Sequence, residues 1–264
     1  MSKRSVIVTN ASSPIGSACA RRFVAEGDRL VLVDRNEAVG RAVANEFIEQ
    51  GKDVVFIAAD CAQKLDVHNI LAEAIENNST IDVFIHNQIT FSDKSFADLT
   101  GEDLDSIYQA DLHSAFLMGQ AVMKHMVRAD ALETPGTSPE NSNKTRSIVM
   151  LYASNASLIG DATFAATQGA IGGLIGALAT AGSRHNVRAN GICVGAVKGA
   201  FATEEELENI SKTSLLGGQG DPIDVAELAY FLSSPFSSYI TGKTIELDGG
   251  GLLKPGNDKY GDPS

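Results

Sequence analysis

The chain has 264 residues, of which 44% are hydrophobic and 20% are charged, so it can bury the core of one well-packed domain. Its formal net charge of −12 argues against nucleic acid and anionic membranes as partners, because both repel an acidic surface. Its three cysteines are far apart, so they predict neither a disulfide framework nor a metal site. We therefore expect a protein of the cytoplasm, with no signal peptide and no membrane-spanning segment.

Apolar runs rich in β-branched residues alternate with helical patterns along the chain. The predicted strands are Ser5–Thr9, Arg29–Val33, Asp53–Ala58, Ile81–His86, Ser147–Tyr152, Val187–Val194 and Thr244–Leu247. The helical patterns lie near residues 14–27, 36–51, 66–77, 102–128, 163–184 and 222–233. Most strands are continuously apolar, which is typical of a parallel sheet buried on both faces. The alternation predicts one α/β domain over residues 1–264, a doubly wound parallel sheet in the order 3-2-1-4-5-6-7 with helices on both faces.

Three segments interrupt this pattern. Residues 129–146 are polar and rich in Pro, Ser and Asn, so they predict a surface loop. Residues 199–220 leave the carboxyl end of a strand and carry an acidic run, which predicts a flexible lid over a bound substrate. Residues 252–264 predict a tail.

Several motifs lie where parallel strands end. The first strand runs into TNASSPIG at residues 9–16, which keeps a single glycine, Gly16, before the first helix. Asp34 ends the second strand, and HNQI at residues 86–89 follows the fourth. SYITG at residues 238–242 precedes the last strand, and Asp-Gly-Gly follows it. Together these segments resemble the short-chain dehydrogenase/reductase family over about residues 5 to 251, with TNASSPIG in place of the glycine-rich TGxxxGIG.

The resemblance implies an NAD(H)-binding oxidoreductase. The implied cofactor contacts are Asn10, Ser12, Ser13, Ile15, Asp34, Asp60, Cys61, Asn87 and Val197. An acidic residue at the end of the second strand accepts the hydroxyls of an adenosine ribose and repels a 2′-phosphate, which favours NAD over NADP. Pro14 departs from the family pattern, because it has no N–H group and adds a ring where the pyrophosphate approaches.

The family's catalytic residues are largely replaced. Relatives use a Tyr as proton donor or acceptor, a Lys four residues later that lowers the Tyr pKa, a Ser that holds the substrate oxygen, and an Asn on a preceding helix. Phe164 stands at the Tyr position, Gln168 at the Lys position and Asp111 at the Asn position, whereas Ser154 is retained. The candidate catalytic residues are therefore Ser154 and Asp111, and ordinary carbonyl reduction is not expected.

Other candidates carry less weight. Tyr239 and Lys243 form a literal Tyr-x-x-x-Lys, but Thr241-Gly242 leads into a strand, so the pair has no helix to place both side chains on one face. Lys198, after the sixth strand, predicts an exposed loop residue. His113 is two positions from Asp111 and cannot share its helix face.

Three functions remain open. The chain is an NAD-dependent oxidoreductase with an unusual acid, a non-redox enzyme of the halohydrin-dehalogenase kind, or a catalytically silent member that binds a nucleotide or a protein partner. Dehalogenases keep the Ser and Tyr and lose the nucleotide carboxylate, which is the reverse of this chain. The resemblance also implies a homotetramer, assembled through the helices near 102–128 and 163–184. The substrate is not indicated.

Overall fold

The computed structural model describes residues 3–76, 80–91, 94–133, 146–153, 162–200 and 203–253. The strands are β1 (Ser5–Thr9), β2 (Arg29–Asp34), β3 (Val54–Ala58), β4 (Val83–His86), β5 (Arg146–Ala153), β6 (Val187–Val194) and β7 (Thr244–Leu247). The helices are α1 (Pro14–Ala25), α2 (Glu37–Ile48), α3 (Lys64–Ala74), η2 (Phe96–Asp98), α4 (Gly101–Ile107), η3 (Tyr108–His113), α5 (Ser114–Glu133), α6 (Ala162–Gly182), α7 (Glu204–Ser211), α8 (Pro222–Leu232) and η6 (Pro235–Ser237).

The strands form one seven-stranded sheet in the order β3-β2-β1-β4-β5-β6-β7. Every neighbouring pair is parallel, so all the carboxyl ends meet at one edge. The fold class and the strand order predicted from the sequence are confirmed. In an open sheet of this kind, ligands bind at the carboxyl edge beside the point where the strand order reverses, here between β1 and β4.

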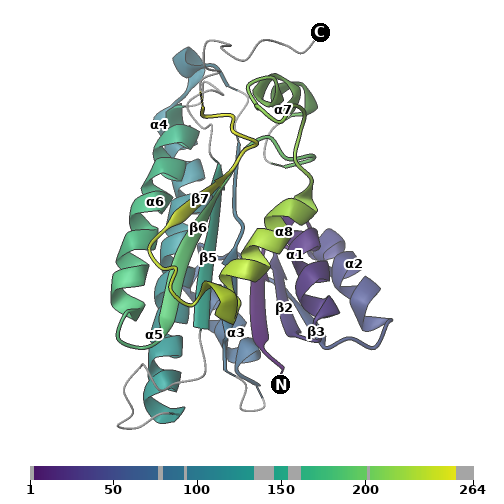
Figure 1. Ribbon diagram of the computed structural model, residues 1–264, viewed down its shortest axis with the longest axis vertical. Helices are drawn as coiled ribbons and strands as arrows, with labels where there is room; N and C mark the ends of the chain where they lie inside the picture. Colours follow the sequence, from purple (N-terminus) through teal and green to yellow (C-terminus); the bar gives the residue numbers. More distant parts are fainter. Residues whose placement is uncertain are drawn as a thin grey trace.

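Helices cover both faces of the sheet (Figure 1). Side chains of successive strand residues point to opposite faces, so Val6 and Val8 pack with α1, α2 and α8, whereas Ile7 packs with α3, α5 and α6. Phe23 and Phe84 are fully buried, one on each face, and burial of each side chain stabilises the fold by about 1.5–3 kcal/mol. The two hydrophobic cores hold the sheet rigid beneath the loops at its carboxyl edge.

The helix predicted near 102–128 is divided and longer. Residues 108–113 form a π-helical turn between α4 and α5, and α5 continues to Glu133. The first part of the predicted loop at 129–146 is therefore helical, and Arg146 already belongs to β5. Residues 134–145 lie outside the described part of the chain. At the end of this turn the Ser114 hydroxyl donates to the Ala110 and Asp111 carbonyl groups of the helix.

The predicted lid contains a helix that the sequence analysis missed. Thr203 accepts a hydrogen bond from the Glu206 N–H, and the Glu206 carboxylate accepts one from the Thr203 N–H. This capping box starts α7, and the acidic run Glu204–Glu206 occupies its first turn, where the helix dipole favours negative charge. The acidic run is thus the start of a helix, and the polar residues around it belong to an ordered element.

The helix α6 is long and apolar enough to cross a membrane by length and composition alone. Ile171, Ile175 and Leu178 bury one face of it against the sheet. A core helix of a soluble fold passes the same test of length and composition, and α6 takes that place here.

Candidate functional site

The loop after β1 is held by hydrogen bonds among three of the predicted cofactor residues. The Ser13 hydroxyl donates to the Asn10 carbonyl (2.9 Å), caps the Gly16 N–H (3.0 Å) and accepts from Asn87 Nδ2 (2.8 Å). Asn10 has a positive φ of 49°, which Asn tolerates better than most residues. A Cβ added to Gly16 would lie 2.2 Å from the Asn10 oxygen, which explains why this one glycine is kept.

Asp34 lies beside this loop at the carboxyl end of β2. Its Oδ2 accepts a hydrogen bond from the Ser12 N–H and its Oδ1 accepts one from the Asn36 N–H, both at 2.9 Å. The side chain is buried, and the added contacts fix its direction. The structure therefore brings Asp34 and Ser12 together at the place where a ribose would be recognised.

Asp60 and Cys61 follow β3, next to the end of β2. The Asp60 carboxylate accepts from the Ala62 N–H (2.9 Å) and lies 3.4 Å from the Arg35 guanidinium. Cys61 is buried, and this burial raises the pKa of its thiol to about 12, so it stays protonated and apolar. Asp60 is partly exposed, whereas the Cys61 side chain belongs to the hydrophobic core that packs against this face of the sheet.

The turn after β6 closes over the start of α1. Gly199 has a φ of +61°, and the Ala200 N–H donates to the Val197 carbonyl (3.1 Å), so residues 197–200 fold back on themselves. A Cβ added to Gly199 would lie 3.1 Å from the Pro14 ring. The space left beneath the turn is about 40 Å³ and is lined mainly by residues of the nucleotide loop and by Ala200. Val197 is almost fully buried in this arrangement.

Gln168 and Asp111, which the resemblance aligns with the family's catalytic Lys and Asn, form a buried pair. Gln168 Nε2 donates to Asp111 Oδ2 (2.7 Å), and Gln168 Oε1 accepts from the Ala153 N–H at the end of β5 (2.9 Å). Asp111 Oδ2 also accepts from the Thr90 N–H (2.9 Å). Burial raises the pKa of Asp111 to about 7, although the hydrogen bonds from Thr90 and Gln168 oppose that rise. The pair joins β5, α6, the π-helical turn and the loop after β4.

Phe164 is also fully buried. It packs edge-on against Phe91, with ring centroids 5.9 Å apart, and contacts an apolar cluster of Ile89, Ala153 and Ala165. The position that a catalytic phenol would occupy is therefore part of a small hydrophobic core. Ser154, the other predicted catalytic residue, lies outside the described residues.

His86 is a buried residue of this site that the sequence analysis did not single out. Its Nδ1 lies 3.3 Å from the Thr9 hydroxyl, and its Nε2 lies 3.5 Å from the Ser114 hydroxyl. Burial lowers the pKa of its imidazole to about 4, so it is neutral at physiological pH. His86 thus connects the nucleotide loop to the π-helical turn that carries Asp111. Its place as the first letter of HNQI, at the end of β4, was the available signal.

The minor candidates behave as the sequence predicted. Tyr239 is fully exposed, and its neighbour Lys243 directly precedes β7, so the two do not share a helix. Lys198 is exposed and lies 3.7 Å from the Asp221 carboxylate. His113 stacks on Tyr108, with ring centroids 6.1 Å apart. None of these belongs to the buried Asp111–Gln168 pair.

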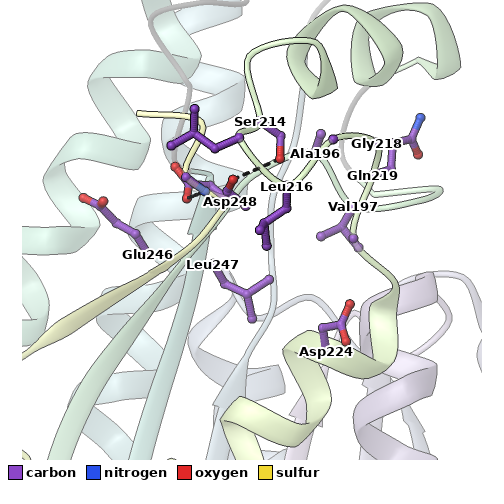
Figure 2. Close-up of a pocket in the computed structure, with 15 residues that line it drawn as sticks. Ala196, Val197, Ser214, Leu216, Gly218, Gln219, Asp224, Glu246, Leu247 and Asp248 are labelled. Atoms are coloured by element: carbon purple, nitrogen blue, oxygen red, sulfur yellow. Dashed lines mark hydrogen bonds between the residues drawn. The ribbon is translucent and has the colours of Figure 1, made fainter. Parts of the chain in front are cut away.

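A larger cavity of about 720 Å³ lies on the other side of the turn after β6 (Figure 2). Val197, Leu216 and Leu247 line it from three separate segments, and Asp248 closes one end by accepting hydrogen bonds from the Gly250 and Leu252 N–H groups. The described residues contain no cluster of His, Cys, Asp or Glu that could hold a metal ion. The sequence analysis gave no sign of this cavity, because its walls meet only in the folded chain.

The predicted cofactor residues fit the adenosine half of NAD better than its pyrophosphate. At the adenosine end, Asp34 is fixed at the place of the ribose hydroxyls and Asp60 lies close by. At the pyrophosphate, Pro14 lacks an N–H group and the Gly16 N–H already donates to Ser13. The space of about 40 Å³ there is far below the roughly 300–1,000 Å³ of pockets that hold small ligands and cofactors. The adenosine half therefore fits this conformation, and the pyrophosphate does not.

The similarity to known proteins extends over nearly the whole chain. The family model described as "Enoyl-(Acyl carrier protein) reductase" matches residues 9–251. A short-chain dehydrogenase/reductase of Armillaria gallica is 30% identical over 260 residues, which cover 94% of this chain and 95% of that protein. Oxidoreductase UcpA of Escherichia coli (strain K12) is 27% identical over 264 residues, which cover 95% of each. A solved short chain dehydrogenase of Bacillus anthracis is 25% identical with a TM-score of 0.82, covering 95% of this chain and 97% of that one.

Proposed function

Because this chain belongs to the short-chain dehydrogenase/reductase family, we propose that it binds NAD(H) at the carboxyl edge of its sheet. The position of Asp34 carries this proposal. Its carboxylate ends β2, is buried, and is oriented by the Ser12 and Asn36 N–H groups beside the nucleotide loop. A carboxylate so placed recognises ribose hydroxyls and repels a 2′-phosphate, so the preferred nucleotide is NAD(H) rather than NADP(H).

Titration with NADH tests this proposal directly. The chain has no tryptophan, so the fluorescence of the nicotinamide is observed without energy transfer from an indole group. We expect saturable binding of NADH and weaker binding of NADPH. A preference for NADPH, or no binding of either nucleotide at millimolar concentration, would refute the proposal.

We propose further that the chain does not reduce ketones by the mechanism of its relatives and acts as a catalytically silent nucleotide-binding member. Phe164 has no proton to give, and it is packed against Phe91 in an apolar cluster. Gln168 has no charge to lower the pKa of a neighbour, and both ends of its amide are occupied by Asp111 and Ala153. General acid–base catalysis contributes about 10²–10⁴-fold, so its loss leaves at most slow turnover.

A slow oxidoreductase is the second candidate, and the environment of Asp111 favours it. A carboxyl group with a pKa of about 7 is protonated in a substantial fraction of molecules at neutral pH. Asp111 therefore holds a proton that the missing tyrosine would otherwise supply. We expect any residual NADH oxidation to fall as the pH rises above 7 and to be lost in Asp111→Asn. A rate that is independent of pH between 6 and 8 would exclude Asp111 as the source.

A dehalogenase role receives no support from the site, since Phe164 stands where that reaction needs a tyrosine. We also propose that the protein works in the cytoplasm, because its three cysteines are unpaired and buried, as expected for a reducing compartment. We propose as well that the protein assembles as a homotetramer.

A further inference from the structure

Building on the proposed NAD(H) binding, we propose that Pro14 sets the affinity of the cleft for a dinucleotide by holding the turn Val197–Ala200 across the path of the pyrophosphate. The whole dinucleotide then binds only after this turn moves away from α1, whereas a ligand that ends at the ribose does not meet it. Pro14 and Gly199 lie close together, since a Cβ built on Gly199 would be 3.1 Å from Pro14 Cγ.

The turn is held from both sides. On the side of the nucleotide loop, Ala200 packs against the core cluster that contains Ile15 and Val197. On the opposite side, the Lys198 N–H donates to the Gly220 carbonyl (3.1 Å), and the Gly220 N–H donates to the Ala196 carbonyl (2.9 Å). The turn is therefore the shared wall between the nucleotide cleft and the 720 Å³ cavity.

The space beneath the turn is too small for a pyrophosphate. It measures about 40 Å³, whereas pockets for small ligands and cofactors are typically about 300–1,000 Å³. The start of α1 is also a poor anion site, because Pro14 has no N–H and the Ser13 hydroxyl takes the Gly16 N–H. Pro14 is itself exposed on its outer side, so a smaller residue there frees the turn without opening the core.

The expected gain in NADH affinity depends on the fraction of molecules in which the turn lies away from α1, the open form. Minor conformations are commonly populated at about 10% or less. When only this fraction accepts the ligand, the apparent affinity is reduced about tenfold or more. Removing the Pro14 ring removes the group that lies beside Gly199, so we expect the open form to become more populated and NADH to bind more tightly.

The test compares the parent protein with Pro14→Gly and Pro14→Ala. Pro235→Gly is the matched control, because Pro235 is also an exposed proline in the first turn of a helix, η6, and contacts neither the nucleotide loop nor the turn. We expect NADH to bind about tenfold more tightly to both Pro14 variants and with parental affinity to Pro235→Gly. Adenosine, measured by calorimetry, should bind the parent and the Pro14 variants alike. Pro14→Ala keeps a good helix former at this position, so it serves if Pro14→Gly loses stability.

Stopped-flow mixing adds a kinetic readout. In the parent, the observed rate of NADH binding should level off at high NADH, at the rate at which the turn opens. In the Pro14 variants it should keep rising with NADH concentration. Equal affinity and equal kinetics in the parent and both variants, with binding lost in Asp34→Ala, would overturn the role of Pro14 and leave the nucleotide site intact. Failure of every variant to bind NADH would overturn both proposals.

Discussion

At the scale of single residues, Asp34 gives the sharpest prediction. Replacing Asp34 by Ala should weaken NADH binding by about 1.5–3 kcal/mol, the value of a charge-assisted hydrogen bond to the ribose. Asp34 also accepts bonds from the Ser12 and Asn36 N–H groups, so its removal loosens the nucleotide loop as well. Titration by nicotinamide fluorescence, with both NADH and NADPH, measures the effect.

Asp34→Asn is the matched control for this change. Its amide oxygen can still accept one of the two backbone hydrogen bonds, but it has no charge to repel a 2′-phosphate. We expect it to lose less NADH affinity than Asp34→Ala and to lose the preference over NADPH. An Asp34→Ala variant with parental affinity for NADH would remove this residue from the site.

Restoring the family's catalytic pair needs a third substitution. Gln168 Nε2 lies 2.7 Å from Asp111 Oδ2, and a Lys at position 168 is longer by one bond, so its ammonium group would lie within reach of the Asp111 carboxylate. The two charges would pair with each other, and the Lys could not lower the pKa of a Tyr at position 164. We therefore expect Phe164→Tyr with Gln168→Lys to gain little ketone reduction, and the same pair combined with Asp111→Asn to gain more.

The measurement is NADH oxidation with a simple ketone, and Phe164→Tyr alone is the control, since its pKa would stay near 10. If the double variant oxidised NADH as fast as the triple variant, or faster, the Lys would not be neutralised by an ion pair with Asp111. Brisk turnover by the unmodified protein would mean that another group supplies the proton.

At the scale of elements, the π-helical turn carries Asp111 and lies next to His86, two buried groups whose pKa values shift in opposite directions. Burial raises the Asp111 pKa to about 7, so the folded state holds this proton more tightly than the unfolded chain, and the contribution to stability is lost as the pH rises from about 4 to 7. Burial lowers the His86 pKa to about 4, so its contribution is lost in the opposite direction, as the pH falls from about 6.5 to 4. The two slopes oppose each other in the pH range that they share.

Asp111→Asn should remove the contribution of Asp111 to the pH dependence of stability and leave that of His86. One oxygen, Oδ2, accepts both bonds from Thr90 and Gln168, so the Asn amide oxygen can keep them without a titrating proton. The gain in the free energy of unfolding over the parent should be about 2 kcal/mol larger at pH 8 than at pH 5.5. Urea unfolding at the two pH values measures it, with Asp105→Asn on the exposed face of α4 as control. A difference that does not change with pH would contradict the raised pKa.

Regular elements were predictable because their signals are local. The ends of β1, β6 and β7 coincide with the apolar runs in the sequence. The π-helical turn was not predictable, because its residues continue the helical pattern of the segment near 102–128 without a break. Helix α7 was missed for a different reason, since its acidic first turn has the composition of a loop.

At the scale of the whole molecule, the outer face of α6 bears on assembly. Gly169, Gly173 and Gly176 have open space beside them, and the neighbouring Phe116 is exposed. Small residues allow close approach of a second copy, so we expect the homotetramer that the family resemblance implies. Sedimentation at micromolar concentration should show it, and Gly173→Glu should shift the protein to smaller species. A parent protein that sediments only as a 27.8 kDa monomer would contradict the prediction.

The sequence indicates candidate residues for the site, but not how they are arranged. Asp34, Ser13 and Asn87 come together because the ends of parallel strands share one edge. The contact of Pro14 with Gly199 joins segments 185 residues apart in the chain, and nothing in the nearby sequence specifies it. The same holds for the pairing of Gln168 with Asp111, although both departures from the family pattern were visible separately.

The environment of the cysteines has a practical consequence. Burial raises the thiol pKa of Cys19 and Cys61 to about 12 and that of Cys193 to about 11, so at neutral pH the native protein offers almost no thiolate to an alkylating reagent. Lys198, on the turn that covers the cleft, is exposed and contributes only a weak surface ion pair. A cysteine introduced by Lys198→Cys would be the one thiol that a maleimide dye labels quickly. In a chain without tryptophan, such a dye would report the position of this single turn as nucleotide is added.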